Sequence, residues 1–252
     1  MMPDKYQEEY VIPGYFIDCN HRLKASSFFD IAQELAVRGS TQLGLPDPVL
    51  NARGMCWILL RNAIHYERLP LMAEKVTLQS WHSGIRGPIS TRDYRMLDAD
   101  GKAIINATSS WALMDYETRR IAKPERISDL LSPEPQCPER ALEPDAPKIV
   151  FPAEAVKEEA GCHLVTWSDL DYNRHANNGK YPHWAMDCLP AEITTNQIVT
   201  DFVLNYNHEV RLGQSVQLIR TQGPDGAWYV EGICEGIQSF TCRIVFTSPD
   251  AS

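Results

Sequence analysis

The sequence has no run of about 20 consecutive apolar residues, which is the length that a membrane-spanning helix needs. Residues 1–10 are polar and acidic, and they lack the basic segment and the apolar core of a secretory signal. These absences argue against a membrane protein and against export. We therefore expect a cytoplasmic location and no membrane partner.

Cysteine pairs and metal-ligand spacings are also missing. The seven cysteines are scattered, their number is odd, and no two of them form a C-x-x-C arrangement. A disulfide framework or a zinc site is therefore not expected. Several cysteines lie in apolar runs, where a free thiol acts as a small core residue. We expect neither a metal ion nor a cofactor.

Basic residues are in the minority. The formal net charge is −9 at pH 7, with 24 Lys and Arg against 33 Asp and Glu. A nucleic-acid partner is not expected, because binding to a polyanion needs a positive field. One local basic cluster comprises Arg119, Arg120, Lys123 and Arg126. It is either a docking patch for an acidic partner or an ordinary solvated turn, and the turn is favoured.

An internal repeat is the most informative feature that is present. The first half predicts a short strand, a helix and four further strands, over residues 15–18, 28–36, 56–66, 75–81, 90–97 and 103–114. The second half repeats this order over residues 163–167, 181–189, 202–207, 215–221, 227–234 and 240–246. Ser27 and Asp30 form a plausible capping box at the start of the first helix. Such self-similarity indicates duplication of one unit, in which a sheet curls around an apolar helix.

A proline-rich stretch separates the two halves. Residues 123–160 hold seven prolines, each of which fixes its backbone angle and removes a hydrogen-bond donor. A connector with little regular structure is expected there.

A polar loop in the second half carries the candidate chemistry. Asp171, Asn173 and His175 stand at alternate positions, which share one side of an extended loop. Asn177 or Asn178 would cap the next helix, and the free backbone N–H groups around Gly179 could stabilise an oxyanion. A polar turn that only caps the helix has about equal weight. Calcium binding is rejected, because Arg174 and Lys180 replace the glycine and the glutamate that a calcium loop requires.

Residues 167–181 read Trp-Ser-Asp-Leu-Asp-Tyr-Asn-Arg-His-Ala-Asn-Asn-Gly-Lys-Tyr. This string resembles the Trp-x-Asp-Leu-Asp-x-Asn-x-His-x-Asn-Asn-x-x-Tyr signature of the acyl-acyl carrier protein thioesterases, and the resemblance covers almost the whole chain. It implies an α+β fold of two tandem hotdog domains, each a long central helix wrapped by an antiparallel sheet. Residues 1–122 would shape the acyl pocket, 123–160 would be the linker, and 161–252 would be catalytic.

The resemblance also implies the site residues. Asp171, Asn173 and His175 match the catalytic Asp, Asn and His of the family. Residues 204–210 parallel a Leu-Glu-Tyr-Arg-Arg-Glu-Cys string of plant members, which places Glu209 on the catalytic glutamate. Val210 replaces the cysteine of that string, so a thiol nucleophile is excluded there. Activated water, with Glu209 or His175 as the base, remains as the mechanism.

The implied substrate is a fatty-acyl chain on the phosphopantetheine of an acyl carrier protein, hydrolysed to the free fatty acid. Lys24 is expected about where His175 stands in the second unit, which leaves one active site per chain. The alternatives are an acyl-CoA thioesterase, a hotdog dehydratase and a non-catalytic acyl-binding module, because one fold hosts many chemistries. A scaffolding subunit is a further alternative, and homodimerisation stays open.

Overall fold

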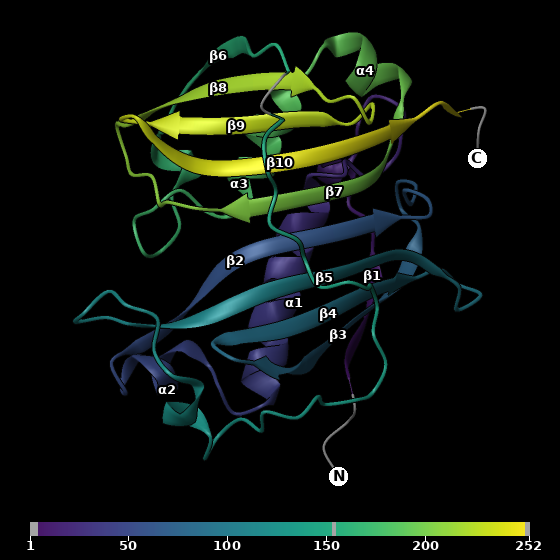
Figure 1. The fold of residues 1–252 in the computed structure, drawn as a ribbon. Helices are drawn as coiled ribbons and strands as arrows, with labels where there is room; N and C mark the ends of the chain where they lie inside the picture. The colour runs from purple at the N-terminus through teal and green to yellow at the C-terminus, as the bar shows by residue number, and fades with distance from the viewer. Residues whose placement is uncertain (1–4, 153–154, 250–252) are drawn as a thin grey trace.

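The computed structural model describes residues 5–152 and 155–249 (Figure 1). Its strands are β1 Tyr6–Val11, β2 Met55–Tyr66, β3 Lys75–Arg86, β4 Ile89–Leu97, β5 Ala103–Asp115, β6 Glu158–Leu164, β7 Ile198–Tyr206, β8 Ser215–Gln222, β9 Trp228–Cys234 and β10 Ile237–Thr247. The helices are α1 Ser27–Gln42, α2 Asp47–Asn51, α3 Lys180–Asp187 and α4 Ala191–Asn196. Short 3-10 turns lie at η1 Gly14–Phe16, η2 Pro124–Ile127 and η3 Trp167–Asp169.

All ten strands form one antiparallel sheet in the order β1-β3-β4-β5-β2-β7-β10-β9-β8-β6. Read from either outer edge inward, each half presents its strands in the same sequence: first, third, fourth, fifth, second. The halves meet where β2 pairs with β7, in register from Arg61 opposite Asn205 to His65 opposite Asp201. The repeat expected from the sequence is therefore present in the strand order.

The first strand of each half was misplaced in the prediction. Residues 15–18 hold the 3-10 turn η1, and the strand is β1, which pairs with β3 from Tyr6 opposite Ser80 to Val11 opposite Lys75. In the second half β6 likewise ends at Leu164, just before η3. The reason is that an edge strand exposes one face to water, so its polar residues hide the apolar pattern.

Helix α1 packs against the sheet, behind the strands of the first half in Figure 1. Its buried side includes Phe28, Phe29, Leu35 and Ala36, and each large apolar side chain contributes about 1.5–3 kcal/mol through burial. Phe29 meets Phe202 of β7 edge to face, with ring centroids 4.9 Å apart. The larger hydrophobic cluster thus spans both halves, and a smaller one packs around Leu50 of α2 and Ile127 of η2.

Two details of the helices differ from the prediction. No capping box forms, because the N-cap is Ser26, which makes no side-chain cap bond, and Asp30 instead lies 3.2 Å from Nε2 of His183. The helix of the second half, α3, has 8 residues against 16 in α1, so it is not the long helix expected. Pro190 follows its end, and proline disfavours helix in the residue before it. None of the described helices is long and apolar enough to cross a membrane.

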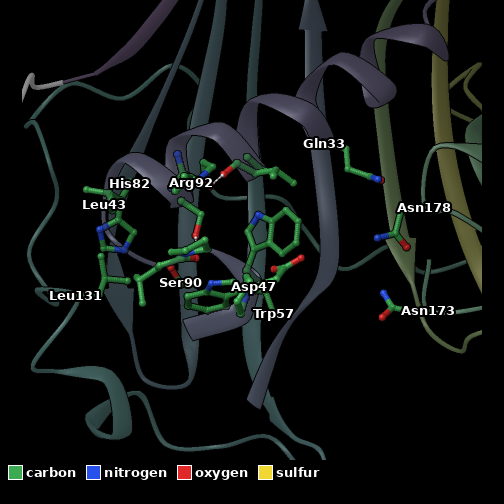
Figure 2. Close-up of a pocket in the computed structure, with 18 of the residues that line it drawn as sticks. Gln33, Leu43, Asp47, Trp57, His82, Ser90, Arg92, Leu131, Asn173 and Asn178 are labelled. Carbon is green, nitrogen blue, oxygen red and sulfur yellow. Dashed lines mark hydrogen bonds between the residues drawn. The ribbon is translucent and has the colours of Figure 1, made fainter. Parts of the chain in front are cut away.

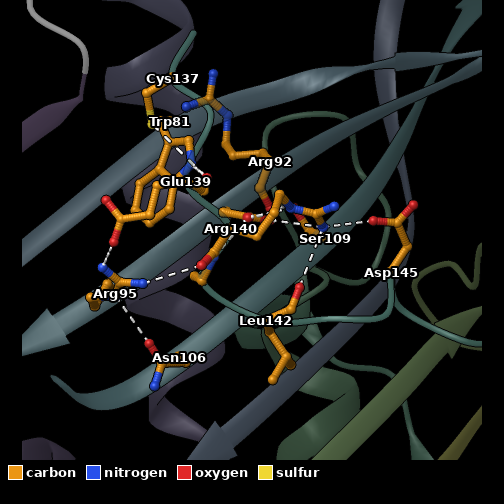
Figure 3. A network of polar contacts seen from close by, with 12 residues as sticks. Trp81, Arg92, Arg95, Asn106, Ser109, Cys137, Glu139, Arg140, Leu142 and Asp145 are labelled. Carbon is orange, nitrogen blue, oxygen red and sulfur yellow. Dashed lines mark hydrogen bonds and ion pairs between the residues drawn. The ribbon is translucent and has the colours of Figure 1, made fainter. Parts of the chain in front are cut away.

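The proline-rich connector has little regular structure, as predicted, although its last residues belong to β6, which starts at Glu158. The connector nevertheless packs on the protein, since it runs across the face of the sheet opposite α1 (Figure 1). The Trp81 indole N–H donates to the Glu139 carbonyl (2.8 Å; Figure 3). Arg140 of the connector donates to Asp93 of β4 (2.8 Å). Asp93 is fully buried, so it needs this charged partner.

Candidate functional site

The loop from Leu170 to Ala176 is a tight turn held by one carboxylate. Asp171 Oδ1 accepts the backbone N–H groups of Asn173 (2.8 Å) and His175 (3.2 Å), and the Asp171 N–H donates to the His175 carbonyl (2.8 Å). Arg174 has a φ of 64°, which completes the reversal. The extended loop expected from the alternating residues is therefore wrong, because Asp side chains bond their own backbone two residues on.

The first half builds the same turn. Asp18 Oδ1 accepts the N–H groups of Asn20 (2.8 Å) and Arg22 (3.0 Å), and the Asp18 N–H donates to the Arg22 carbonyl (2.8 Å). His21 has a φ of 61°, like Arg174 in the second half. Arg22, and not Lys24 as predicted, therefore occupies the position of His175. The Asp-x-Asn framework forms the turn in both halves, so it does not by itself mark a catalytic site.

The segment that pairs with the end of each turn shows a second difference between the halves. The Leu23 N–H donates to the Pro70 carbonyl (2.8 Å), and the Ala176 N–H donates to the Val210 carbonyl (2.9 Å). This correspondence places Leu69 of the first half at the position of Glu209. The polar pair His175 and Glu209 is thus replaced by Arg22 and Leu69. The prediction of one site per chain agrees with this difference between the halves.

His175 and Glu209 come together, as their predicted roles require. His175 Nδ1 lies 3.3 Å from Glu209 Oε2, and the two side chains are 24% and 28% exposed. Glu209 also accepts from Arg119 Nη2 (2.9 Å) and from Arg211 Nη2 (2.8 Å). No hydrogen bond or ion pair with another described residue occupies His175 Nε2. The imidazole therefore has a carboxylate beside one nitrogen and no partner among the described residues at the other.

The arginines set the ionisation of Glu209. Partial burial would raise the pKa of this carboxyl, but hydrogen bonds from Arg211 and then Arg119 outweigh it and lower the pKa below its usual range. Glu209 is consequently a charged acceptor at neutral pH. A carboxylate stabilised in this way is a poor proton acceptor, and it suits the orientation of an imidazole better.

The predicted basic cluster divides between two places. Arg119 joins the candidate site through Glu209, whereas Arg126 pairs with Asp115 (2.6 Å). Arg120 and Lys123 are exposed and form no ion pair with any described residue. No local sequence pattern predicts that Arg119 reaches Glu209, because 90 residues separate them. Arg211 stands two residues after Glu209 and could have been named from that spacing.

The start of α3 differs from the expected cap. The N-cap is Gly179, and its N–H donates to Asn177 Oδ1 (2.8 Å), while the Lys180 N–H donates to the Asn177 carbonyl (2.9 Å). The Asn177 N–H likewise donates to the Asp169 carbonyl (2.7 Å), so the backbone donors of Asn177 and Gly179, two of the three residues expected to stabilise an oxyanion, are already bonded. A Cβ on Gly179 would lie 2.0 Å from Asp30 Oδ1, so this close approach requires glycine. The side-chain amide of Asn178 has no hydrogen-bond partner among the described residues.

A cavity of about 320 Å³ lies between α1 and strands β2 to β5 and reaches the loop (Figure 2). Asp171, Asn173 and Asn178 line it at the loop, and Figure 2 places Asn173 and Asn178 on one side with His82 and Leu131 far across. Its apolar wall includes Ala36, Leu43, Leu45, Trp57, Trp111 and Leu131. This volume falls in the range of small-molecule sites, about 300–1,000 Å³.

The described residues contain no cluster of three or more His, Cys, Asp or Glu side chains that could hold a metal ion. The His175–Glu209 pair offers acid–base chemistry by an imidazole with a carboxylate beside it. Polar amides lie beside the end of a largely apolar cavity. His175 and Glu209 do not themselves line the cavity, so a water molecule activated by the imidazole would meet the acyl group at the loop, where Asp171 and Asn173 line the cavity end.

Comparison with known proteins identifies similar chains along nearly the full length. The family model described as the acyl-ACP thioesterase N-terminal domain matches residues 3–129, and that of the C-terminal domain matches residues 154–245. A chloroplastic acyl-[acyl-carrier-protein] hydrolase of Cuphea viscosissima is 24% identical over 242 residues, which cover 87% of this chain and 55% of the relative. A chloroplastic palmitoyl-acyl carrier protein thioesterase of Gossypium hirsutum is 25% identical over 226 residues, covering 86% and 54%. The chain spans about half the length of these curated relatives.

Solved structures share the fold. An acyl-ACP thioesterase from Bacteroides thetaiotaomicron aligns with a TM-score of 0.87 at 22% identity, covering 97% of this chain and 98% of the other. A 12:0-ACP thioesterase from Umbellularia californica aligns with a TM-score of 0.86 at 20% identity, covering 98% and 99%. At these identities the likeness concerns the fold alone.

Proposed function

The chain belongs to the acyl-ACP thioesterase family, and from this premise we propose that it hydrolyses the thioester of a fatty-acyl carrier protein. The products would be a free fatty acid and the carrier protein with its phosphopantetheine thiol. The observation that carries the proposal is the His175–Glu209 pair, next to the loop whose Asp171 and Asn173 line the end of a largely apolar cavity.

We assign the base to His175. Its free Nε2 takes a proton from water, the hydroxide adds to the carbonyl carbon, and the C–S bond then breaks. The thiolate leaves readily and takes up the proton from the imidazolium. Glu209 holds Nδ1 and stabilises the imidazolium that forms. Glu209 is the weaker candidate for the base, because two arginines stabilise its charge.

The other residues of the loop position His175 or contact the substrate. Asp171 holds the turn that presents His175, as Asp18 holds the matching turn, so we propose a positioning role for it. The amides of Asn173 and Asn178 line the cavity end and are the proposed donors to the substrate carbonyl. Asn177 and Gly179 shape the start of α3 and bond each other, so we give them no direct contact with the oxyanion.

The proposed organisation is two tandem hotdog units, 1–122 and 161–252, with the linker 123–160 between them. The matched strand order supports this division. The first unit supplies most of the cavity wall, and the second supplies His175 and Glu209. The cytoplasmic location and the association of two chains stay predictions. The connector covers part of the sheet face opposite α1, which limits how a second chain could pair there.

The experiment is hydrolysis of a panel of acyl-acyl carrier proteins and acyl-CoAs by the wild type and by two variants. His175→Ala removes the proposed base, and Arg22→Ala is the matched control, because Arg22 occupies the same turn position in the first half. We expect release of fatty acid from the carrier-protein substrates, lost in His175→Ala and kept in Arg22→Ala.

Two other outcomes would overturn the proposal. Faster turnover of the acyl-CoA series would make the chain an acyl-CoA thioesterase. Binding of both series without turnover would make it an acyl-binding module.

A further inference from the structure

Arg92 of β4 is a buried cation that lacks an anionic partner. It is 8% exposed and lines the cavity, and its guanidinium makes one hydrogen bond with the described residues, from Nη1 to Ser80 Oγ (3.0 Å). No carboxylate of the described residues lies within ion-pair distance of it. A guanidinium has five N–H donors, so most of them have no partner in the protein. Buried charges are normally paired, which makes Arg92 an exception that needs an explanation.

Its neighbours do not supply the missing acceptor. His82 stands directly opposite Arg92 on β3 and lines the same cavity, and its Nε2 is buried without a partner. Burial, and then the charge of Arg92, lower the pKa of His82 to about 4, so the imidazole is neutral. Gln33 Oε1, also on the wall, is a further buried atom without a partner.

The carboxylates that line the cavity already accept hydrogen bonds from groups other than Arg92. Asp47 accepts from the Tyr172 hydroxyl (2.6 Å), and Asp171 Oδ1 accepts from the backbone of its own turn. The guanidinium packs against Gly39 of α1, where a Cβ would lie 2.3 Å from Nη1. The absence of a side chain at Gly39 thus leaves the room that this cation occupies on the cavity wall.

These groups lie away from the candidate catalytic end. In Figure 2, Arg92 and His82 lie on the side of the cavity opposite Asn173 and Asn178. An acyl chain with its thioester carbonyl beside the loop would extend toward Arg92. A methyl end arriving there would displace water from the guanidinium and replace none of its hydrogen bonds.

We propose that this distal end of the cavity binds an oxygen-bearing acyl tail, best met by a terminal carboxylate, with Arg92 as the specificity-determining residue. A carboxylate accepts two parallel N–H bonds from a guanidinium, and a hydroxyl accepts one. The inference rests on the proposed function for the thioester end of the ligand, and it names the class of acyl chain.

Binding of non-hydrolysable probes tests the tail separately from catalysis. The probes are S-alkyl pantetheines, which contain no thioester, in matched lengths from butyl to hexadecyl and ending in a methyl, hydroxyl or carboxylate group. Isothermal titration gives their dissociation constants with the wild type, Arg92→Met and Arg92→Lys. Arg95→Met is the matched control, since Arg95 lies on the same strand but contacts Glu139 on the opposite face.

Above the length that reaches Arg92, we expect the carboxylate probe to bind the wild type about tenfold or more tighter than the methyl probe, with the hydroxyl probe between them. Arg92→Met should reverse this order, Arg92→Lys should reduce it, and Arg95→Met should keep it. Equal or tighter binding of the methyl probes at every length in the wild type would overturn the proposal, even if no Arg92 variant folds. Hydrolysis of acyl-carrier substrates that depends on His175 would still stand in that case, so the two failures are distinguishable.

Discussion

Replacing Glu209 by glutamine separates the two possible bases. If His175 is the base, Glu209→Gln removes only the charge that orients and stabilises the imidazole, so part of the activity survives. If Glu209 is the base, the same change removes the proton acceptor and abolishes turnover. The glutamine keeps the size of the side chain but only one oxygen, so one of Arg119 and Arg211, which bond different oxygens of Glu209, keeps its acceptor.

The size of the loss follows from the distance between the two groups. Nδ1 and Oε2 are 3.3 Å apart. Unit charges at that distance attract by ~1 kcal/mol in bulk water and by ~5 kcal/mol at an effective dielectric constant of ~20. Both side chains are partly exposed, and two arginines share the carboxylate. We therefore expect ~2–3 kcal/mol, which lowers kcat/KM ~30- to 150-fold.

The assay compares kcat/KM of the wild type, Glu209→Gln and His175→Ala on the preferred acyl-carrier substrate. Removal of a general base costs ~10²- to 10⁴-fold, so His175→Ala should be the slower variant. Glu67→Gln serves as the control, because Glu67 follows the corresponding strand of the first half. The reasoning fails if Glu209→Gln is as slow as His175→Ala while its melting temperature is unchanged.

Four other substitutions test the description. Asp171→Ala and Asp18→Ala each lose two bonds to a charged acceptor and should lower the free energy of unfolding by ~2–4 kcal/mol, yet only Asp171→Ala should also lose activity. His82 is neutral when folded, with a pKa of about 4 against 6.5 unfolded, so stability is lost as the pH falls from 6.5 toward 4, by up to ~3 kcal/mol. Unfolding of His82→Gln measured across this window should lack that loss. Gly179→Ala should displace Asp30 and destabilise by ~1–3 kcal/mol in thermal melts.

Much of the fold could be predicted from apolar periodicity. Strands such as β2, β5 and β10 are long and buried on at least one side, so their apolar residues recur regularly. The edge strands β1 and β6 were missed, because their exposed residues are polar and their neighbours on the sheet lie far along the chain. Local patterns do not report such distant pairing.

The loop from Leu170 to Ala176 shows a second limit of prediction from the sequence. Alternate spacing of Asp171, Asn173 and His175 suggested one shared side, but the carboxylate bonds the backbone and curls the chain into a turn. The register between the halves was wrong by two residues, since Arg22 and not Lys24 matches His175. Only the hydrogen bonds reveal this match. The unpaired charge of Arg92 could not be predicted either, because the sequence does not show which partners a buried side chain lacks.

The turn occurs twice, and this fact changes what its residues mean. Asp18 holds the same turn in the first half, where Arg22 and Leu69 replace His175 and Glu209. An aspartate at this position is therefore not explained by catalysis alone. The distinguishing pair is His175 with Glu209, which lies in the second half, while most of the cavity wall belongs to the first. Pairing of β2 with β7 and the contact of Asp30 with His183 fix the two halves against each other. Because the proposed site takes residues from both halves, the proposed activity requires that the two halves be paired.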